Sequence, residues 1–514
     1  MKKVLIRLLK IFTVVLIFIV ILAITSANYL LNAWGELSFS TVLYQLLSPL
    51  KGTNKEIIIQ YVQDAVIPAL MISVGIGIGW FMIFKVFSVL RVNISGNLFK
   101  KELKIELNGK LILKNVKKIK RFLRGAITIV LGVVLISKAE QIGIFEYIND
   151  ILNSSTIFEE QYVKPESDKI HFGDNTKNLI YIYMESMETT YSDRNSGGEK
   201  DVNYIPNLMR ISSENISFSH NEKLGGLLTT PGTSWTMAAL LGSTSGIPFK
   251  LPINGNSAGE HATFLPGAIS LGEVLQENGY VNYFMCGSEI AFGGRESYLN
   301  QHGDYVIFDY DTAVKDGLID PDYYEFWGFG DRKLYEYAKI KLNEIAGKGE
   351  KFNFTMLTID THHPEGHECE FCPKTYDEQY ANVISCADAQ IDEFLEWMKQ
   401  QSWYEDTTIV IAGDHASMNN TFFDNVETRS IYNCFINSAV EVSGETKNRK
   451  ACVLDMFPTT LAAMGVEIEE ERLGMGTNLF SERQTLMEEM GEEEFNKELA
   501  RYSKYYMEEF VKGE

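Results

Sequence analysis

Three long apolar stretches near the start of the chain constrain what it can fold into. They run from Leu5 to about Leu31, from Val66 to about Leu90 and, shorter than the others, from about Phe122 to Ser137. A helix needs roughly 20 apolar residues to cross the hydrocarbon core of a bilayer, a length that the third stretch only approaches. The sequence therefore predicts three transmembrane helices ahead of any globular part.

Basic residues are distributed unevenly around these stretches, and this distribution indicates a topology. The segment from Arg91 to Arg124 holds 11 Lys and Arg but only two acidic residues, whereas the segment between the first two stretches holds only Lys51 and Lys55. Four more basic residues precede or begin the first stretch: Lys2, Lys3, Arg7 and Lys10. Because cytoplasmic loops carry the excess of Lys and Arg, we expect the N-terminus and the Arg91–Arg124 segment inside and everything after the third helix outside.

The first stretch has an alternative interpretation as a secretory signal peptide. Thr25-Ser26-Ala27 offers a weak cleavage site after an apolar core. The apolar run nevertheless continues through Leu31, and two further apolar stretches follow it. We therefore expect the first helix to be retained as a membrane anchor, in residues 1–139 that form the membrane domain.

The net charge of −21 conceals two halves of opposite sign. Residues Met1–Arg124 contain 18 Lys and Arg against five Asp and Glu, so the remainder of the chain has 63 acidic and 29 basic residues. Proteins that bind nucleic acid need a surplus of Lys and Arg to neutralise phosphates. The acidic remainder argues against nucleic acid as a partner of the extracytoplasmic part.

Beyond a polar linker at residues 140–170, short buried strands alternate with helical patterns. The helical patterns include Trp235–Leu241, Ile269–Asn278, Arg332–Ile345 and Tyr380–Lys399. The expected strands, rich in β-branched and aromatic residues, are Asn178–Met184, Tyr280–Cys286, Phe352–Ile359 and Thr407–Ala412. This alternation predicts an α/β catalytic domain with a central, largely parallel sheet at residues 171–480. An acidic, solvated helix is expected at residues 481–514.

All six cysteines lie beyond the third apolar stretch, in the part expected outside the cell, where disulfides persist. The pair Cys369-x-x-Cys372, together with His367 and Cys386, also suggests a zinc knuckle, but its spacing fits that site poorly. We expect a disulfide that joins Cys386 to Cys369 or to Cys372.

Polar side chains follow the expected strands, where open α/β sheets bind their ligands. Glu185 follows the first strand, His362 lies within Asp360-Thr361-His362-His363-Pro364 after the third, and Asp414-His415 follows the fourth. Each alone is more typical of a solvated loop or a cap. Together they provide oxygen and imidazole ligands suited to Mn²⁺, Mg²⁺ or Zn²⁺.

Thr233 is a candidate nucleophile because Gly232 frees the backbone before it and a helical pattern follows. At a helix N-terminus the unpaired N–H groups favour an anionic phosphate, and a bound metal would activate the hydroxyl. The alternative is that Thr233 is only a helix N-cap.

These residues belong to a set of short motifs that occur in a characteristic order behind membrane helices. The set comprises Tyr183-Met184-Glu185-Ser186, Pro231-Gly232-Thr233, Gly246-Ile247-Pro248, Trp327-Gly328-Phe329 with Asp331, Asp360 to Pro364, and Gly413-Asp414-His415. It resembles the phosphoglycerol transferase and lipoteichoic acid synthase group of the sulfatase and alkaline phosphatase superfamily, over roughly Asn178 to Phe480. The resemblance implies a sulfatase-like α/β fold.

The resemblance also implies a role for each site residue. The metal ligands would be Glu185, Thr233, Asp414 and His415, with Mn²⁺ as the expected ion, and Thr233 would also take the glycerophosphoryl group. The residues that hold glycerophosphate would be Arg295 and His362, with the adjacent His363 as an alternative. The donor would be phosphatidylglycerol in the bilayer, and the acceptor a glycan or a teichoic-acid-type chain.

The chain departs from the lipoteichoic acid branch at one position near Arg295. That branch has Trp two residues before the arginine, whereas this chain has Gly293, so the resemblance does not settle how glycerol is recognised.

Three other functions compete with this interpretation. A sulfatase needs Cys or Ser in a C/S-x-P-x-R context, which Thr233-Ser234-Trp235-Thr236 does not provide. A phosphoethanolamine transferase also uses a Thr nucleophile, and a non-catalytic glycolipid sensor would use the same pocket.

Overall fold

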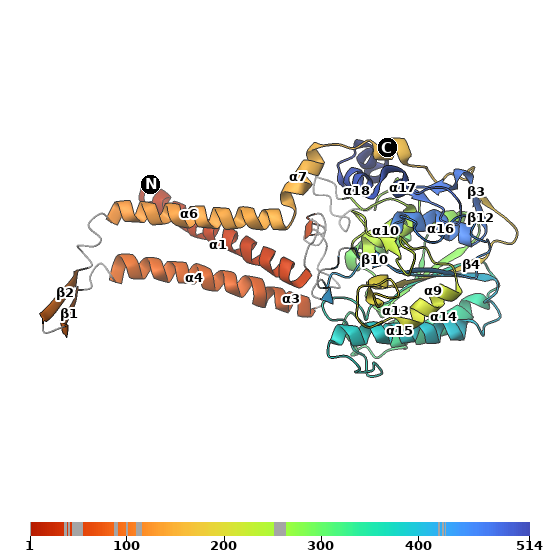
Figure 1. The fold of residues 1–514 in the computed structure, drawn as a ribbon, viewed down its shortest axis with the longest axis horizontal. Helices are drawn as coiled ribbons and strands as arrows, with labels where there is room; N and C mark the ends of the chain where they lie inside the picture. The colour runs from red at the N-terminus through yellow and green to blue at the C-terminus, as the bar shows by residue number, and fades with distance from the viewer. Residues whose placement is uncertain are drawn as a thin grey trace. The chain divides into compact units, whose positions relative to one another are not determined.

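The computed structural model describes residues 2–34, 39, 42–43, 55–86, 91–98, 101–108, 116–250, 264–419, 422–423, 426 and 428–513. The chain forms two compact units, Met1–Leu37 with Lys55–Glu146, and Ser38–Asn54 with Tyr147–Glu514 (Figure 1). Lys51, which entered the topology prediction, lies outside the described residues.

The first unit contains three helices that are long and apolar enough to cross a membrane. Their apolar spans are Ile11–Ala33, Ile58–Phe84 and Lys118–Gln141. The first and third spans lie in α1 (Lys2–Trp34) and α6 (Val116–Gln141). The second span is built from α3 (Lys55–Tyr61), η1 (Val62–Val66), α4 (Ile67–Phe81) and η2 (Met82–Val86). The prediction of three apolar helices is confirmed.

Large apolar side chains on these helices face outward, as expected for segments whose solvent is lipid. Phe12, Met71 and Ile129 are each about two-thirds exposed. Between the second and third spans, β1 (Arg91–Leu98) pairs antiparallel with β2 (Lys101–Asn108). The basic segment that was expected inside the cell therefore contains a pair of antiparallel strands.

The second unit is built around a six-stranded sheet. The strands follow the order β11 (Asn433–Ile436), β9 (Thr407–Gly413), β4 (Asn178–Met184), β8 (Phe352–Leu357), β6 (Val281–Cys286) and β7 (Val306–Phe308). All neighbouring pairs are parallel except β11 with β9. The predicted α/β domain with a largely parallel sheet is confirmed, and each of the four predicted strands is present.

The sheet separates two hydrophobic cores, because alternate residues of its central strand point to opposite faces. Tyr181 and Tyr183 enter one core, and Ile180 and Ile182 enter the other. The first core is covered by α10 (Thr236–Ser245), α11 (Leu271–Glu277) and α16 (Met456–Ala463). The second is covered by α9 (Pro206–Glu214), α14 (Asp331–Ala346) and α15 (Gln379–Met398) (Figure 1).

The segment expected as a linker at residues 140–170 is largely helical. It contains α7 (Ile144–Leu152) and α8 (Ile157–Gln161), and it leads into β3 (Ile170–Phe172), which pairs with β12 (Val466–Ile468). Shorter elements complete the unit: η3 (Thr189–Tyr191), β5 (Leu227–Leu228), η4 (Phe292–Gly294), α12 (Arg295–Gln301), α13 (Tyr310–Lys315), β10 (Ser430–Ile431), η6 (Val453–Asp455), η7 (Glu469–Glu471), β13 (Arg472–Leu473) and β14 (Gly476–Thr477).

The acidic tail differs from the single solvated helix expected at residues 481–514. It divides into α17 (Leu486–Met490), α18 (Glu492–Ala500) and the π-helix η8 (Tyr506–Lys512), with Gly491 at φ 83° between the first two. Its apolar residues Phe495 and Phe510 are buried in the first core. The glutamates obscured this apolar face in the sequence.

The structure pairs Cys372 with Cys386 in a disulfide, one of the two pairings expected. Cys369, the other candidate, keeps its thiol 3.3 Å from the Cys372 sulfur. The disulfide ties the segment that follows His362 to α15.

Candidate active site

Three of the residues predicted as metal ligands converge at the carboxyl ends of the two central strands. Glu185 directly follows β4, and Asp414 and His415 directly follow β9. One ligand atom from each lies within 4.8 Å of the others, and all three residues are at least 98% buried. Two carboxylates and one imidazole around a buried point form a donor set suited to a divalent cation.

The Glu185 side chain is held from several sides. The Ser186 hydroxyl donates to Oε1 at 2.7 Å, and the Thr236 hydroxyl donates to Oε2 at 3.3 Å. The Glu185 backbone is fixed by β8 and the residues after it, because its N–H donates to Thr358 Oγ1 at 2.9 Å and its carbonyl accepts from the Thr361 hydroxyl. These contacts orient the carboxylate toward Asp414 and His415.

Asp414 has one satisfied oxygen and one that lacks a hydrogen-bond donor. Oδ1 accepts the backbone N–H groups of Ser186 and His415, each at 2.8 Å. Oδ2 is buried, has no hydrogen-bond partner among the described residues, and lies 3.3 Å from His415 Nε2. Burial, followed by the charge of Glu185, raises the pKa of Asp414 to about 6. A buried carboxylate oxygen without a donor is costly unless a cation binds it.

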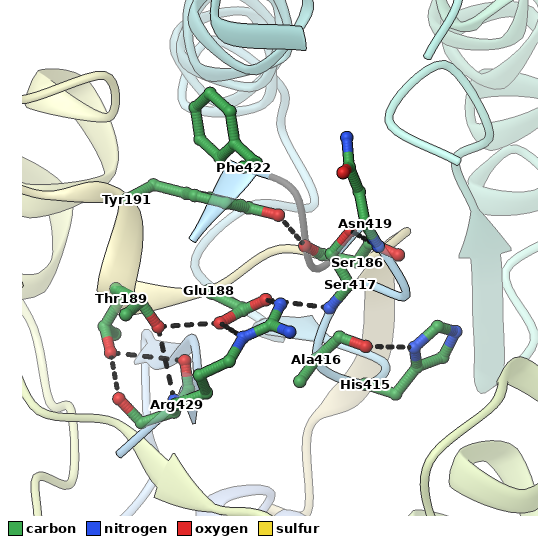
Figure 2. Close-up of polar contacts among 12 residues, drawn as sticks. Ser186, Glu188, Thr189, Tyr191, His415, Ala416, Ser417, Asn419, Phe422 and Arg429 are labelled. Atoms are coloured by element: carbon green, nitrogen blue, oxygen red, sulfur yellow. Dashed lines mark hydrogen bonds and ion pairs between the residues drawn. The ribbon is translucent and has the colours of Figure 1, made fainter. Parts of the chain in front are cut away.

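His415 directs one ring nitrogen into the same space. Its Nδ1 lies 2.8 Å from the Ala416 carbonyl, which can only accept, so Nδ1 carries a proton (Figure 2). Nε2 then faces Glu185 Oε1 at 3.5 Å and Asp414 Oδ2 at 3.3 Å. Burial alone would lower the pKa of His415, but Asp414 and Glu185 raise it above its ordinary value. A proton or a metal ion would occupy the same lone pair of Nε2.

The predicted nucleophile Thr233 is buried, but it is not a helix N-cap. The helix α10 begins three residues later at Thr236, with Trp235 in the N-cap position. The Thr233 hydroxyl donates to the Thr230 carbonyl at 2.8 Å. Both lone pairs of the oxygen remain available, because the hydroxyl is the donor in this bond.

The turn before Thr233 depends on Gly232. Its φ is 79°, and a Cβ at this position would lie 2.8 Å from the Phe249 carbonyl oxygen. The Phe249 N–H donates to the Gly232 carbonyl at 2.8 Å. Any side chain here would displace the segment that carries Thr233, so the expectation that Gly232 frees this backbone agrees with the structure.

His362 lies at the edge of the same site and is partly exposed, whereas the alternative His363 is 5% exposed. Burial lowers the pKa of His362 to about 4, and the charges of His415, Asp414 and Arg295 also act on it. His362 is therefore neutral at physiological pH and within electrostatic range of the candidate metal ligands.

Arg295 is more engaged than the sequence suggested. It begins α12 and is 4% exposed; Nε donates to the Phe292 carbonyl, and Nη2 donates to Ser288 Oγ and the Glu289 carbonyl. Nη1 has no hydrogen-bond acceptor among the described residues and is the nitrogen left for a ligand. In this loop conformation, one guanidinium nitrogen of Arg295 is thus left to hold a phosphate oxygen, as the resemblance implies for this residue.

Sequence reasoning missed two kinds of site residue. Hydroxyls that contact Glu185 come from Ser186, Thr236, Thr358 and Thr361; Ser186 and Thr361 lie in motifs quoted from the sequence, but no role was predicted for any of the four. Trp327 was noted as part of a motif without a role, and its ring lies 4.9 Å from that of His362 and 5.0 Å from that of Phe292. Trp327 therefore lies next to the loop that contains Gly293, the position at which the lipoteichoic acid branch has a tryptophan.

The family model described as Sulfatase matches residues 177–466, which is more than half of the chain. The chain belongs to the sulfatase family. The resemblance inferred from short motifs is thereby confirmed, and the match covers the sheet and every candidate ligand. In this sulfatase-family protein, the segment Thr233-Ser234-Trp235-Thr236 does not contain the C/S-x-P-x-R sequence of a hydrolytic sulfatase.

Curated relatives of this sulfatase-family protein include phosphoglycerol transferase I from Escherichia coli (strain SMS-3-5 / SECEC). The two are 33% identical over 311 residues, which cover 59% of this chain and 39% of the relative. The chain thus spans about two-fifths of the length of the curated relatives that it matches.

Among solved structures, the lipoteichoic acid synthase LtaP from Listeria monocytogenes is 18% identical with a TM-score of 0.47. The match covers 63% of this chain and 80% of LtaP. A protein of the alkaline phosphatase superfamily from Vibrio parahaemolyticus is 19% identical with a TM-score of 0.44, and the match covers 62% of this chain and 74% of that chain.

Proposed function

We propose that this protein is a membrane-anchored transferase that moves glycerophosphate from phosphatidylglycerol to an extracytoplasmic glycan or polyglycerolphosphate acceptor. The observation that supports this most is the buried convergence of Glu185, Asp414 and His415 at Thr236, the first residue of α10 and three residues after Thr233, in a chain 33% identical to phosphoglycerol transferase I. The orphaned Asp414 Oδ2 fits a divalent cation, for which Mn²⁺ is our first choice and Mg²⁺ or Zn²⁺ the alternatives.

Glu185, Asp414 and His415 would hold the cation, with the Thr233 oxygen as a fourth ligand. When bound, such an ion lowers the pKa of a coordinated hydroxyl and neutralises phosphate charge. The Thr233 oxygen would attack the phosphorus of phosphatidylglycerol as its hydroxyl loses its proton; the bond from phosphorus to the diacylglycerol oxygen would break, that oxygen would take up a proton, and glycerophosphate would remain on Thr233. In the second step an acceptor hydroxyl would attack the same phosphorus and lose its proton, while the bond from phosphorus to Thr233 breaks and the Thr233 oxygen is protonated again.

Other residues of the site bind and orient the phosphate. The Thr236 hydroxyl and the N-terminus of α10 favour an anionic group in front of Glu185. Nη1 of Arg295 can donate to a phosphate oxygen. The Nδ1 of the neutral His362 ring faces the His363 carbonyl at 2.9 Å, so its Nε2 can accept from a glycerol hydroxyl. Trp327, which lies beside His362, offers an apolar surface for the glycerol carbons.

The membrane helices support a lipid donor. Three apolar helices keep the catalytic unit at a bilayer, which raises the effective concentration of a lipid substrate relative to a soluble enzyme. We place the catalytic unit outside the cell, where a glycan or teichoic-acid-type chain would be available as acceptor.

Product analysis tests the proposed reaction. The full-length protein in detergent or nanodiscs is incubated with Mn²⁺, phosphatidylglycerol labelled in its headgroup glycerol, and candidate acceptors. We expect diacylglycerol and a labelled acceptor, and no comparable product from labelled phosphatidylethanolamine. Preferential transfer of phosphoethanolamine would instead support the rival transferase, and binding without any product would support a sensor.

Reporter fusions test the compartment. We expect fusions after Leu50, Lys110 and Asp168 to report outside, inside and outside, because Lys and Arg are concentrated before the first span and between the second and third. The measurement uses a pair of reporters, one active only in the cytoplasm and one active only outside it. An inside signal at Asp168 would contradict the assigned compartment.

A further inference from the structure

We propose that Glu188 and Arg429 form a buried clamp that positions the candidate metal ligands, although neither residue belongs to the ligand set. Glu188 is fully buried and lies three residues beyond Glu185. Arg429 donates to it through both arms of its fork, from Nε to Oε2 at 3.0 Å and from Nη2 to Oε1 (Figure 2). The inference rests on the proposed metal site and assigns two positioning residues to it.

The clamp joins the two segments that carry the ligands. Glu188 Oε1 also accepts the backbone N–H of Ser417 at 2.7 Å, two residues after His415. Figure 2 shows both contacts: the His415 ring is hydrogen-bonded to the Ala416 carbonyl, and the next residue, Ser417, donates its backbone N–H to Glu188. One carboxylate thus ties the segment after β4 to the segment after β9.

A third segment is attached through Tyr380. Its hydroxyl lies 2.7 Å from Ser417 Oγ and donates to the Thr361 carbonyl at 2.9 Å. Thr361 precedes His362 and donates through its own hydroxyl to the Glu185 carbonyl. The loops that carry the proposed metal ligands and the proposed phosphate-binding histidine therefore share one hydrogen-bonded network.

The chemistry of the pair suits this role. A bidentate arginine–carboxylate contact fixes both distance and angle, which a lysine cannot do with a single ammonium group. The Arg429 guanidinium lies 3.9 Å above the Phe423 ring, and Phe423 in turn stacks on Tyr191, with ring centres 5.5 Å apart. The Tyr191 hydroxyl donates to the Ser186 carbonyl at 3.0 Å. The contacts of Arg429 thus extend, through Phe423 and Tyr191, to the residue next to Glu185.

Such support should be measurable as metal affinity. Groups that orient metal ligands without touching the ion typically change affinity by about 10- to 100-fold when they are removed. A pair that only stabilised the fold would lower the melting temperature but leave the affinity of the folded protein unchanged. Affinity and stability measured on the same variants therefore separate the two roles.

The experiment titrates Mn²⁺ into the full-length, metal-free protein and follows the free ion by electron paramagnetic resonance, with the melting temperature recorded in parallel. We expect Glu188→Gln to raise the Mn²⁺ dissociation constant about 10- to 100-fold, because the amide loses the charge that pairs with Arg429 and keeps only one acceptor oxygen. Arg429→Lys retains the positive charge and should raise the constant by about 10-fold, which keeps the proposal testable even where Glu188→Gln does not fold.

Glu488 provides a matched control elsewhere in the domain. It is a partly buried carboxylate that binds Arg449 through two nitrogens, at 2.8 and 3.3 Å, and accepts the backbone N–H of Lys450. None of its hydrogen bonds among the described residues reaches the segments that carry the candidate ligands. We expect Glu488→Gln to lower the melting temperature while changing the Mn²⁺ dissociation constant less than about threefold.

Two outcomes would overturn the clamp, and they have different meanings. If the wild type binds Mn²⁺ and folded Glu188→Gln and Arg429→Lys bind it within threefold of wild type, the pair is structural only and the proposed function stands. If the wild type binds no Mn²⁺, Mg²⁺ or Zn²⁺, the metal site fails, and with it both the clamp and the proposed reaction.

Discussion

Thr233→Ala is expected to reduce diacylglycerol release from phosphatidylglycerol by at least about 10³-fold, because the substitution removes the oxygen that accepts the phosphoryl group. The fold should lose only about 1 kcal/mol, the usual contribution of one hydrogen bond, here to the Thr230 carbonyl. Activity is measured as product formed by full-length protein in nanodiscs, and stability by thermal unfolding.

Thr233→Ser is the control for this substitution. It keeps a hydroxyl in place and should retain measurable activity, whereas the alanine variant should not. Wild-type protein quenched shortly after mixing with donor, without acceptor, should carry a glycerophosphate adduct on the peptide that contains Thr233. Normal diacylglycerol release by a folded Thr233→Ala protein would rule out this residue as the nucleophile.

Mn²⁺ at 100 times its dissociation constant should stabilise the wild type at pH 7 by about 2.7 kcal/mol, since it binds only the folded state. Asp414→Asn should lose most of this gain, because Oδ2 would be replaced by an amide or a neutral oxygen. The measurement is thermal unfolding with and without Mn²⁺. An equal Mn²⁺-dependent stabilisation of wild type and variant would show that the ion binds elsewhere.

The metal-free protein should respond to pH in the opposite direction from a typical acid-sensitive protein. The pKa of Asp414 is raised to about 6 when folded, so the folded state binds this proton more tightly than the unfolded chain. The free energy of unfolding should therefore increase as the pH falls from 7 through 6 toward 4, relative to Asp414→Asn. Added Mn²⁺ should reverse the trend, because it binds the deprotonated carboxylate.

The elements that the sequence predicted best are buried strands, because burial on both faces produces an unbroken run of apolar residues. Asn178–Met184 was predicted with the bounds that β4 has, because the six residues after Asn178 form the continuous apolar run of a strand covered on both faces. β11 was not predicted, since Asn433–Ile436 is only four residues long. The burial of Phe495 and Phe510 was missed because the glutamates around them dominate the local composition.

The same reasoning explains which site residues were found. Glu185, Asp414 and His415 directly follow strong strands, and the parallel topology brings strand ends together. Arg295 was named through the family resemblance, but its hydrogen bonds to Ser288 and the Glu289 carbonyl depend on a local loop conformation that no periodicity predicts. Glu188 and Arg429 were missed because a salt bridge between distant residues has no signature in one sequence.

The candidate metal site also couples metal binding to the completion of folding. Ser186 and Asp414, which share a hydrogen bond beside the ligands, are 228 residues apart in the chain. Their contact exists only after β4 has paired with β9, with β8 on its other side, so no local fragment can assemble the ligand set. If the proposed metal site is correct, the chain would bind the ion only late in folding, and bound metal would report that these three strands have paired.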